Sequence, residues 1–267
     1  MDIPIEEVGT NGFTMRFIRF GSGEKTFVML PGLSVKSVLE FADDIADAYA
    51  SFKDNFTVYV FDRISSLPSE YSIEDMARDT AGAMIALGLS DVYLFGVSQG
   101  GMIAMVIAIE HPELVRKMVL GSTSAHVQKP QAELIGKWIE AAEKRDGVGL
   151  YLAFGEEIYP RDVFEASRES LISAGKAVTE TEFRRFSILA EPIKTFDITD
   201  RLGDIRCPVL TIGAYDDRLL DPDATMEIAE KLDAMPGFRL FMYPGYGHAA
   251  YDIAPDYKNK VLDFMLR

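Results

Sequence analysis

The run Gly96-Val97-Ser98-Gln99-Gly100 has the pattern of a nucleophile held on a sharp turn. A strand-like apolar segment precedes it, and a helix-like apolar segment follows it. A serine between strand and helix takes a strained backbone conformation that pushes its hydroxyl outward, and side chains two residues away on either side would collide. Glycine relieves both collisions. The spacing therefore predicts that Ser98 is a nucleophile.

A serine hydroxyl is a poor nucleophile at neutral pH, so it needs an imidazole base and a carboxylate that fixes the imidazole tautomer. The chain has three histidines. His111 lies just past the helix-like segment after Ser98, and His126 lies at the start of a long helical segment that begins at residue 125. His248 follows the last strand-like segment in a glycine-rich stretch, which favours it as the general base.

Three aspartates follow the strand-like segment at residues 209–212 and compete for the role of the acid. Asp221 precedes a proline at a helix start and is explained as a cap or turn residue. Asp217 is favoured over Asp216, because an aspartate followed by arginine, two apolar residues and a helix start is a turn that anchors a buried acid. Asp216 stays open as the alternative.

Apolar, β-branched segments alternate with longer segments of helical period, which predicts an α/β fold with a mostly parallel central sheet flanked by helices. We expect strands near residues 13–20, 27–30, 57–61, 92–95, 118–120, 209–212 and 239–243. We expect helices at residues 35–50, 73–87, 101–110, 223–232 and 249–266.

The alternation stops between residues 125 and 206, where the chain has helical periodicity, many charges and no convincing strand. We interpret this segment as a helical cap, or lid, and residues 1–124 and 207–267 as the core domain. Ligands bind at the carboxyl edge of open parallel sheets, so a lid above that edge would shape substrate choice.

Composition limits the partners. The 267 residues carry a formal charge of −15, which disfavours nucleic acid and anionic membrane surfaces. No run approaches the roughly 18 apolar residues that span a membrane, and the first residues lack the pattern of a secretion signal. Cys207 is the only cysteine and should pack in the core. We expect a cytoplasmic protein.

These residues resemble the α/β-hydrolase fold enzymes over nearly the whole chain, with the order Ser98, Asp217, His248. Counting nine residues from Pro208, as the family's acid loop does, also reaches Asp217. Where the family usually has His-Gly after an early strand, this chain has Pro31-Gly32-Leu33. The resemblance implies that the backbone N–H groups of Leu33 and Gln99 form the oxyanion hole.

Two departures from the family pattern concern the site. Many relatives carry Asp-x-Arg-Gly-x-Gly where this chain has Asp62-Arg63-Ile64-Ser65, so we expect a loop of different shape. The lid sequence matches none that we can tie to a substrate. Its aromatic residues either line a substrate pocket or pack the lid's own core: Trp138, Tyr151, Phe154, Phe164 and Phe186.

The triad implies a serine hydrolase that cleaves a carboxylic ester, or a related acyl bond, of a small-molecule substrate through an acyl-enzyme. The chemistry requires no metal or organic cofactor. Thioesters, lactones and carbon–carbon bonds are alternative targets of the same triad, and a small-molecule receptor with slow hydrolysis is an alternative function. The oligomeric state is left open.

Overall fold

Eight strands form one sheet in the computed structural model, which describes residues 3–267, and their order is β1-β2-β4-β3-β5-β6-β7-β8. β1 and β2 are antiparallel, as are β2 and β4, and all other neighbouring strands are parallel. The predicted mostly parallel sheet is therefore confirmed. The strands are β1 (Ile5–Gly9), β2 (Thr14–Phe20), β3 (Lys25–Leu30), β4 (Phe56–Ile64), β5 (Val92–Val97), β6 (Val115–Gly121), β7 (Val209–Ala214) and β8 (Arg239–Tyr243).

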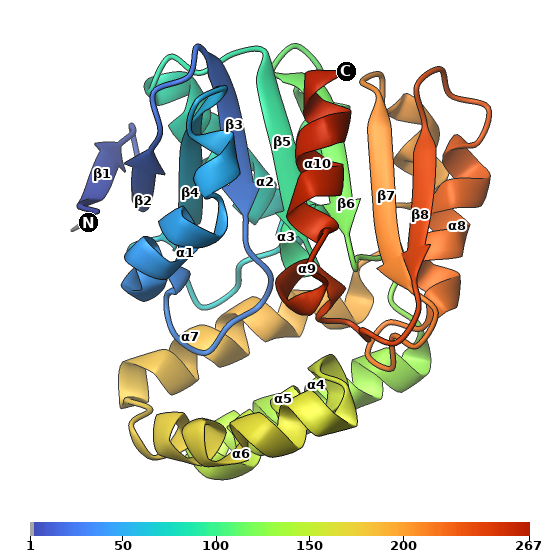
Figure 1. The fold of residues 1–267 in the computed structure, drawn as a ribbon. Coiled ribbons are helices and arrows are strands. Elements are labelled where there is room, and N and C mark those ends of the chain that lie inside the picture. Colours follow the sequence, from blue (N-terminus) through green and yellow to red (C-terminus); the bar gives the residue numbers. More distant parts are fainter. Residues whose placement is uncertain (1–2) are drawn as a thin grey trace.

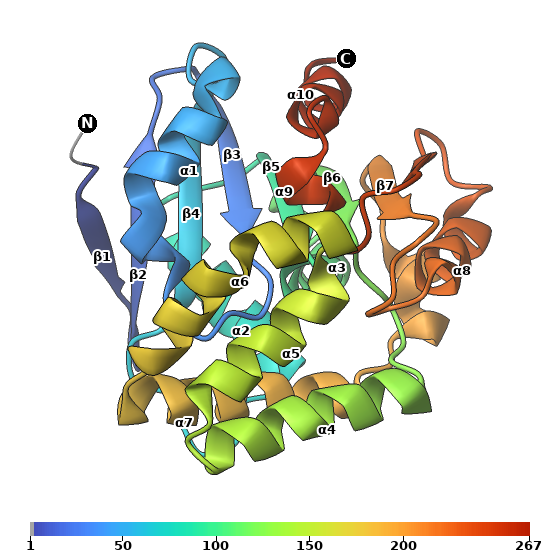
Figure 2. The ribbon, with the colours of Figure 1, turned by 60° about the horizontal axis from the view of Figure 1, so that its bottom comes forward.

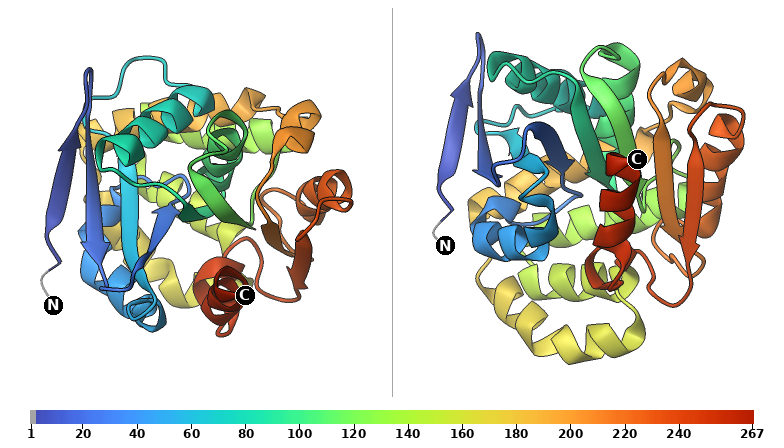
Figure 3. Two further views of the ribbon diagram at one scale, coloured as in Figure 1. Left: turned by 90° about the horizontal axis from the view of Figure 1, so that it is seen from above. Right: turned by 45° about the horizontal axis from the view of Figure 1, so that its top comes forward.

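Helices cover both faces of the sheet (Figures 1 and 3). On one face lie α1 (Ala42–Ala48) and α10 (Tyr257–Leu266), whose buried side chains share an apolar cluster with residues of the strands. On the other face lie α2 (Ile73–Ala86), α3 (Gln99–Glu110) and α8 (Pro222–Leu232). Helix α3 is buried along residues 99–108, so the turn that precedes it is anchored in the core.

Two predicted helices differ from the structure, and one strand of the structure was not predicted. The segment at residues 35–50 forms the 3₁₀ helices η1 (Val38–Phe41) and η2 (Ala50–Phe52) on either side of α1. The segment at residues 249–266 is broken into α9 (Ala250–Ile253) and α10, because proline at position 255 forces Ala254 into an extended conformation. Strand β1 was not predicted, since Val8 is its one buried residue and its pattern is weak.

Four helices between β6 and β7 lie across the edge of the sheet where the parallel strands end (Figures 1 and 2). They are α4 (Lys129–Glu143), α5 (Gly147–Ile158), α6 (Arg161–Lys176) and α7 (Glu180–Ala190), followed by the 3₁₀ helices η3 (Glu191–Thr195) and η4 (Thr199–Asp204). We call α4–α7 the helical layer. Edge-to-face packing of Phe154 on Trp138 and on Phe186 joins α4, α5 and α7.

Within residues 3–267, no helix is long and apolar enough to cross a membrane.

Candidate active site

Ser98 lies between β5 and α3 with φ 52° and ψ −123°, a conformation that non-glycine residues rarely adopt. The flanking glycines make this turn possible. A Cβ atom on Gly96 would come within 2.3 Å of the Gly100 carbonyl oxygen, and one on Gly100 within 2.0 Å of the Leu30 carbonyl oxygen. The collisions expected from the sequence are therefore real, and they confine both positions to glycine.

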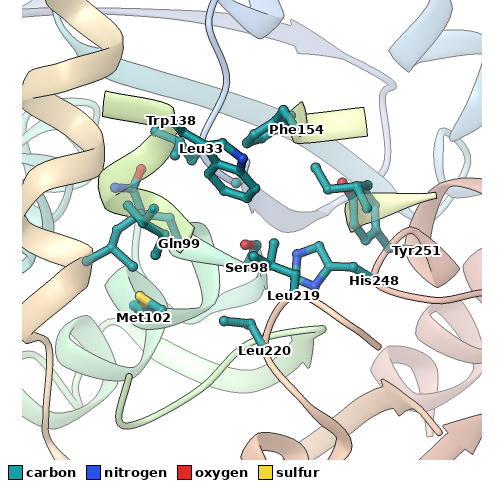
Figure 4. Close-up of a pocket in the computed structure, with 14 residues that line it drawn as sticks. Leu33, Ser98, Gln99, Met102, Trp138, Phe154, Leu219, Leu220, His248 and Tyr251 are labelled. Carbon is teal, nitrogen blue, oxygen red and sulfur yellow. The ribbon is translucent and has the colours of Figure 1, made fainter. Parts of the chain in front are cut away.

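His248 follows β8 on a loop and is buried, with 1% of its surface exposed. Its Nδ1 lies 2.9 Å from Oδ2 of Asp217, which is also buried. With Nδ1 donating to this carboxylate, the other ring nitrogen is left as a proton acceptor. Figure 4 shows the His248 ring next to Ser98 at the same cavity, which both residues line.

The three competing aspartates have separate positions. Asp217 Oδ1 accepts hydrogen bonds from the backbone N–H groups of Leu219 and Leu220, while Oδ2 faces His248. Asp216 is exposed and accepts from the backbone N–H groups at positions 245 and 247, so it holds the loop that carries His248. Asp221 caps α8 through the N–H at position 223. Of the three, Asp217 is the aspartate that contacts the imidazole.

The pKa of Asp217 is shifted in the direction that keeps it ionised. Burial acts to raise the pKa, but the electrostatic interaction and hydrogen bond with His248 and the hydrogen bonds from the two backbone N–H groups outweigh burial and lower it. An ionised carboxylate at this position fixes the tautomer of His248 and stabilises an imidazolium cation.

The two predicted oxyanion positions, Leu33 and Gln99, line the cavity beside Ser98 (Figure 4). The loop after β3 runs close against the serine, since a Cβ on Gly32 would lie 3.1 Å from the Ser98 Cβ. Gln99 is the first residue of α3, where the backbone N–H points out of the helix and the helix dipole favours negative charge. Both backbone segments thus lie beside Ser98.

The side chain of Gln99 connects three parts of the molecule, which the sequence did not predict. It is fully buried; its Oε1 accepts from Arg63 Nη2 at 2.9 Å, and its Nε2 donates to the Leu189 carbonyl oxygen of α7 at 2.5 Å. Arg63 Nη2 also donates to the Pro31 carbonyl oxygen at 3.0 Å. Burial lowers the pKa of Arg63 to about 10, partly offset by Asp62, so the guanidinium remains charged at neutral pH.

A second set of contacts joins the helical layer to the loop that carries Leu33. Arg185 of α7 donates through Nη2 to Asp62 Oδ1 at 2.5 Å and through Nη1 to the Ser34 carbonyl oxygen at 2.9 Å. Ser37 donates to the other oxygen of Asp62. The residues Asp62 and Arg63, where the chain departs from its relatives' motif, thus support both predicted oxyanion segments.

Comparison with known proteins decides the family. The family model described as alpha/beta hydrolase fold matches residues 25–196. The chain belongs to the α/β-hydrolase fold family. Its strand order and the position of Ser98 between β5 and α3 therefore belong to an architecture that carries hydrolases.

Individual α/β-hydrolases show how far the similarity extends. Serine hydrolase BPHL of Mus musculus is 28% identical over 153 residues, which cover 52% of this chain and 51% of that protein, about half its length. RutD of Pseudomonas savastanoi pv. phaseolicola, named as a candidate carbamate hydrolase, is 27% identical over 235 residues, with 82% of this chain and 87% of that protein covered. MGS-M2, an α/β-hydrolase enzyme from a deep-sea metagenome library of the Medee basin, has the same fold, with a TM-score of 0.87 at 20% identity over 98% of both chains.

Mostly apolar side chains enclose the cavity that Ser98 and His248 line. Of the aromatic residues singled out in the sequence, Trp138 and Phe154 line this cavity, and Tyr151 lines a neighbouring one. Phe164 and Phe186 are buried among the helices and line neither. Several lining residues were not predicted from the sequence because they come from separate elements: Met102, Ile135, Ile193, Leu219, Leu220 and Tyr251.

The remaining sequence candidates lie away from this cavity. His111 follows the last residue of α3, and its Nδ1 lies 3.3 Å from Oε1 of Glu113 at the surface. His126 forms an isolated backbone bridge with Asp197. Cys207 is buried, as expected, and burial raises the pKa of its thiol to about 12. Among the described residues, no group of three or more His, Cys, Asp or Glu side chains is arranged to hold a metal ion.

Proposed function

We propose that this protein is a serine hydrolase that cleaves carboxylic esters of small molecules through a covalent acyl-enzyme, with Ser98 as nucleophile, His248 as base and Asp217 as acid. The observation that carries the proposal is the buried 2.9 Å contact between His248 Nδ1 and Asp217 Oδ2, beside a serine held on a strained turn. This combination activates a hydroxyl for attack on an acyl carbonyl.

In the first half of the cycle, Ser98 Oγ attacks the ester carbonyl carbon while His248 Nε2 takes the hydroxyl proton. The carbonyl oxygen becomes an oxyanion that accepts hydrogen bonds from the backbone N–H groups of Leu33 and Gln99. The bond from the carbonyl carbon to the alcohol oxygen then breaks, and the proton on His248 passes to that oxygen. Asp217 stabilises the imidazolium throughout.

In the second half, a water molecule gives a proton to His248 and attacks the acyl-serine carbonyl. The same oxyanion contacts form again, the bond to Ser98 Oγ breaks, and the proton returns to the serine. The helical layer acts as a cap in this proposal, because it covers the carboxyl edge of the sheet and contributes Trp138 and Phe154 to the cavity. An apolar cover reduces the access of water to Ser98 and strengthens these electrostatic contacts.

The first test combines a fluorophosphonate probe with turnover of simple esters. We expect the probe to label Ser98 with one molecule per chain, as mapped by mass spectrometry, and the unlabelled protein to turn over an ester many times. Ser98→Ala should lose both the labelling and the turnover while its thermal unfolding is unchanged. Ser124→Ala is the matched control, because Ser124 is fully buried and its hydroxyl has no hydrogen-bond partner among the described residues.

Labelling at Ser98 without multiple turnovers would favour a small-molecule receptor over an enzyme. Retained hydrolysis in Ser98→Ala would contradict the proposal. Esters are the substrates to try first; a chain that turned over thioesters or lactones much faster would keep the triad but change the bond that it cleaves.

A further inference from the structure

Two cavities of very different size meet next to Ser98. The catalytic cavity, lined by Ser98 and His248, has a volume of about 30 Å³, and a neighbouring cleft has a volume of about 590 Å³. The two share five lining residues, so they are adjacent: Gly32, Leu33, Phe154, Ile158 and Tyr251. A water molecule needs roughly 10–15 Å³ on this measure, so the catalytic cavity has space for only about two to three groups of the size of a water molecule.

The catalytic cavity is small because its walls are well packed. Met102 comes from the buried helix α3, and Ile135 and Trp138 come from α4; each of these three side chains is at most 2% exposed. Well-packed side chains of this kind enlarge a cavity only if their neighbours repack, which is unfavourable. The space beyond Ser98 on this side therefore fits a short group.

The neighbouring cleft is large, apolar and open to the surface. Its floor includes Met29 and Phe95 of the sheet, and Phe154 of α5 contributes to its cover. Phe41, at the end of η1, lines the cleft and is 52% exposed, so the cleft reaches the solvent there. Its volume lies within the roughly 300–1,000 Å³ of sites that bind small molecules.

The charged groups of the cleft balance one another. Two lysines and two aspartates line it, so its side chains have no net formal charge: Lys36, Lys258, Asp44 and Asp252. Both lysines already have partners in the protein, since Lys258 Nζ donates to the Asp252 carbonyl oxygen and Lys36 Nζ lies 3.8 Å from Glu182. The lysines of the cleft therefore offer no unpaired positive charge to a ligand, and most of its lining is apolar.

We infer that the substrate is an asymmetric, uncharged ester, with a long apolar arm on one side of the scissile carbonyl and a short group on the other. The long arm lies in the cleft between η1, α1 and the helical layer, and the short group lies in the catalytic cavity. This inference rests on the proposed function. The five lining residues that the cleft shares with the cavity around Ser98 place it beside the serine, and on this ground we assign the cleft to the substrate itself.

Four esters test the inference: methyl acetate, octyl acetate, methyl octanoate and octyl octanoate. We expect one of the two mixed esters to have a kcat/KM at least about tenfold above methyl acetate, since each buried methylene adds to binding. Octyl octanoate should be at least about tenfold below that mixed ester, because one of its arms has no space. Equal rates for the two mixed esters, or a maximum for either symmetric ester, would overturn the inference.

A variant that narrows the cleft gives the second readout. Ala48 is an exposed residue of α1 that lines the cleft, so Ala48→Trp should reduce kcat/KM for the preferred mixed ester about tenfold more than for methyl acetate. Ala50→Trp is the matched control, because Ala50 is also exposed, lies two residues away and lines neither cavity. An equal effect of Ala48→Trp on both esters would overturn the role of the cleft.

Failure of this inference is distinguishable from failure of the proposed function. Labelling of Ser98 by the fluorophosphonate, with the four esters hydrolysed at similar kcat/KM, would leave the serine hydrolase intact and remove the asymmetry. No labelling and no hydrolysis of any of the four esters would overturn both.

Discussion

The side chain of Gln99 donates a hydrogen bond to the backbone carbonyl of Leu189, which connects the turn of the proposed nucleophile to helix α7 of the helical layer. The Nε2 to carbonyl oxygen distance is 2.5 Å, and the two residues are 90 positions apart in the sequence. Gln99 also carries one of the two proposed oxyanion N–H groups. The position of α7 and the direction of that N–H group are therefore coupled through a single residue.

Replacing Gln99 by methionine tests this coupling. Gln99→Met keeps the backbone N–H and nearly the same side-chain length, but it leaves the buried Leu189 carbonyl oxygen without this donor. An unpaired buried polar group costs about 1–3 kcal/mol, so we expect a lower melting temperature. We also expect kcat to fall about tenfold to a hundredfold with a small change in KM, less than the 10²–10³ of a lost oxyanion donor.

Steady-state kinetics on an ester and thermal unfolding measure both effects. Gln128→Met is the control, since Gln128 is exposed at the start of α4 and should tolerate the change. An unaltered kcat in Gln99→Met, with the expected loss of stability, would show that the side chain is structural only.

Arg185 connects the helical layer to the other proposed oxyanion segment. The side chains of Arg185 and Asp62 are 17% and 8% exposed, so Arg185→Met leaves a largely buried carboxylate that keeps the hydrogen bond from Ser37 but loses its ion pair with Arg185. Removal of one partner of a buried ion pair costs about 3–5 kcal/mol, and exposure of this pair places the expected loss at the lower end, about 3 kcal/mol. The freed loop at Ser34 should also lower kcat about tenfold, a modest part of the loss known for oxyanion donors.

Urea unfolding and ester kinetics check the two parts of this prediction. Arg184→Met is the matched control, because Arg184 is the adjacent, exposed arginine of α7. Arg185→Lys should recover part of the stability, since the charge remains while the two-pronged contact is lost. Equal effects of Arg184→Met and Arg185→Met would contradict a specific role.

Local sequence patterns were sufficient to predict the turn around Ser98, and they favoured His248 and Asp217 as its partners while leaving Asp216 open. The glycines at 96 and 100 and the turn after β7 are set by steric and capping rules that act over a few residues. The alternation of strands and helices predicted the sheet for the same reason, since each buried strand is apolar over its own short length.

Side-chain contacts such as that between Arg185 and Asp62, which lie far apart in the chain, could not be predicted from the sequence. Arg185 and Asp62 are separated by 123 positions, and nothing in either neighbourhood indicates that they pair. The size of the catalytic cavity likewise depends on how Met102 and Trp138, from different elements, pack together. A single sequence specifies which residues are apolar, whereas the three-dimensional packing specifies which of them surround Ser98.

The two adjacent aspartates should have different effects when each is changed to asparagine. Asp217→Asn removes the acceptor that fixes the His248 tautomer, and we expect kcat to fall about 10⁴-fold, as in other triads. Asp216→Asn weakens the contacts that hold the backbone at positions 245 and 247, so it should lower the melting temperature and reduce kcat less than about tenfold. The kcat of both variants on one ester tests which aspartate is the acid. A larger loss of kcat in Asp216→Asn would assign that role to Asp216.

Asp217 should also make stability depend on pH. Its folded-state pKa lies below the ordinary 3.8, because His248 and two backbone N–H groups outweigh burial. Such a carboxylate stabilises the folded state above its ordinary pKa, and this stabilisation is lost as the pH falls through the lowered value. We expect Asp217→Asn to be less stable than the unmodified protein at pH 5–7, with the gap narrowing below about pH 3.8. Urea unfolding of both proteins across this range measures the gap, and a gap that stays constant would show that the charge of Asp217 contributes nothing to folding.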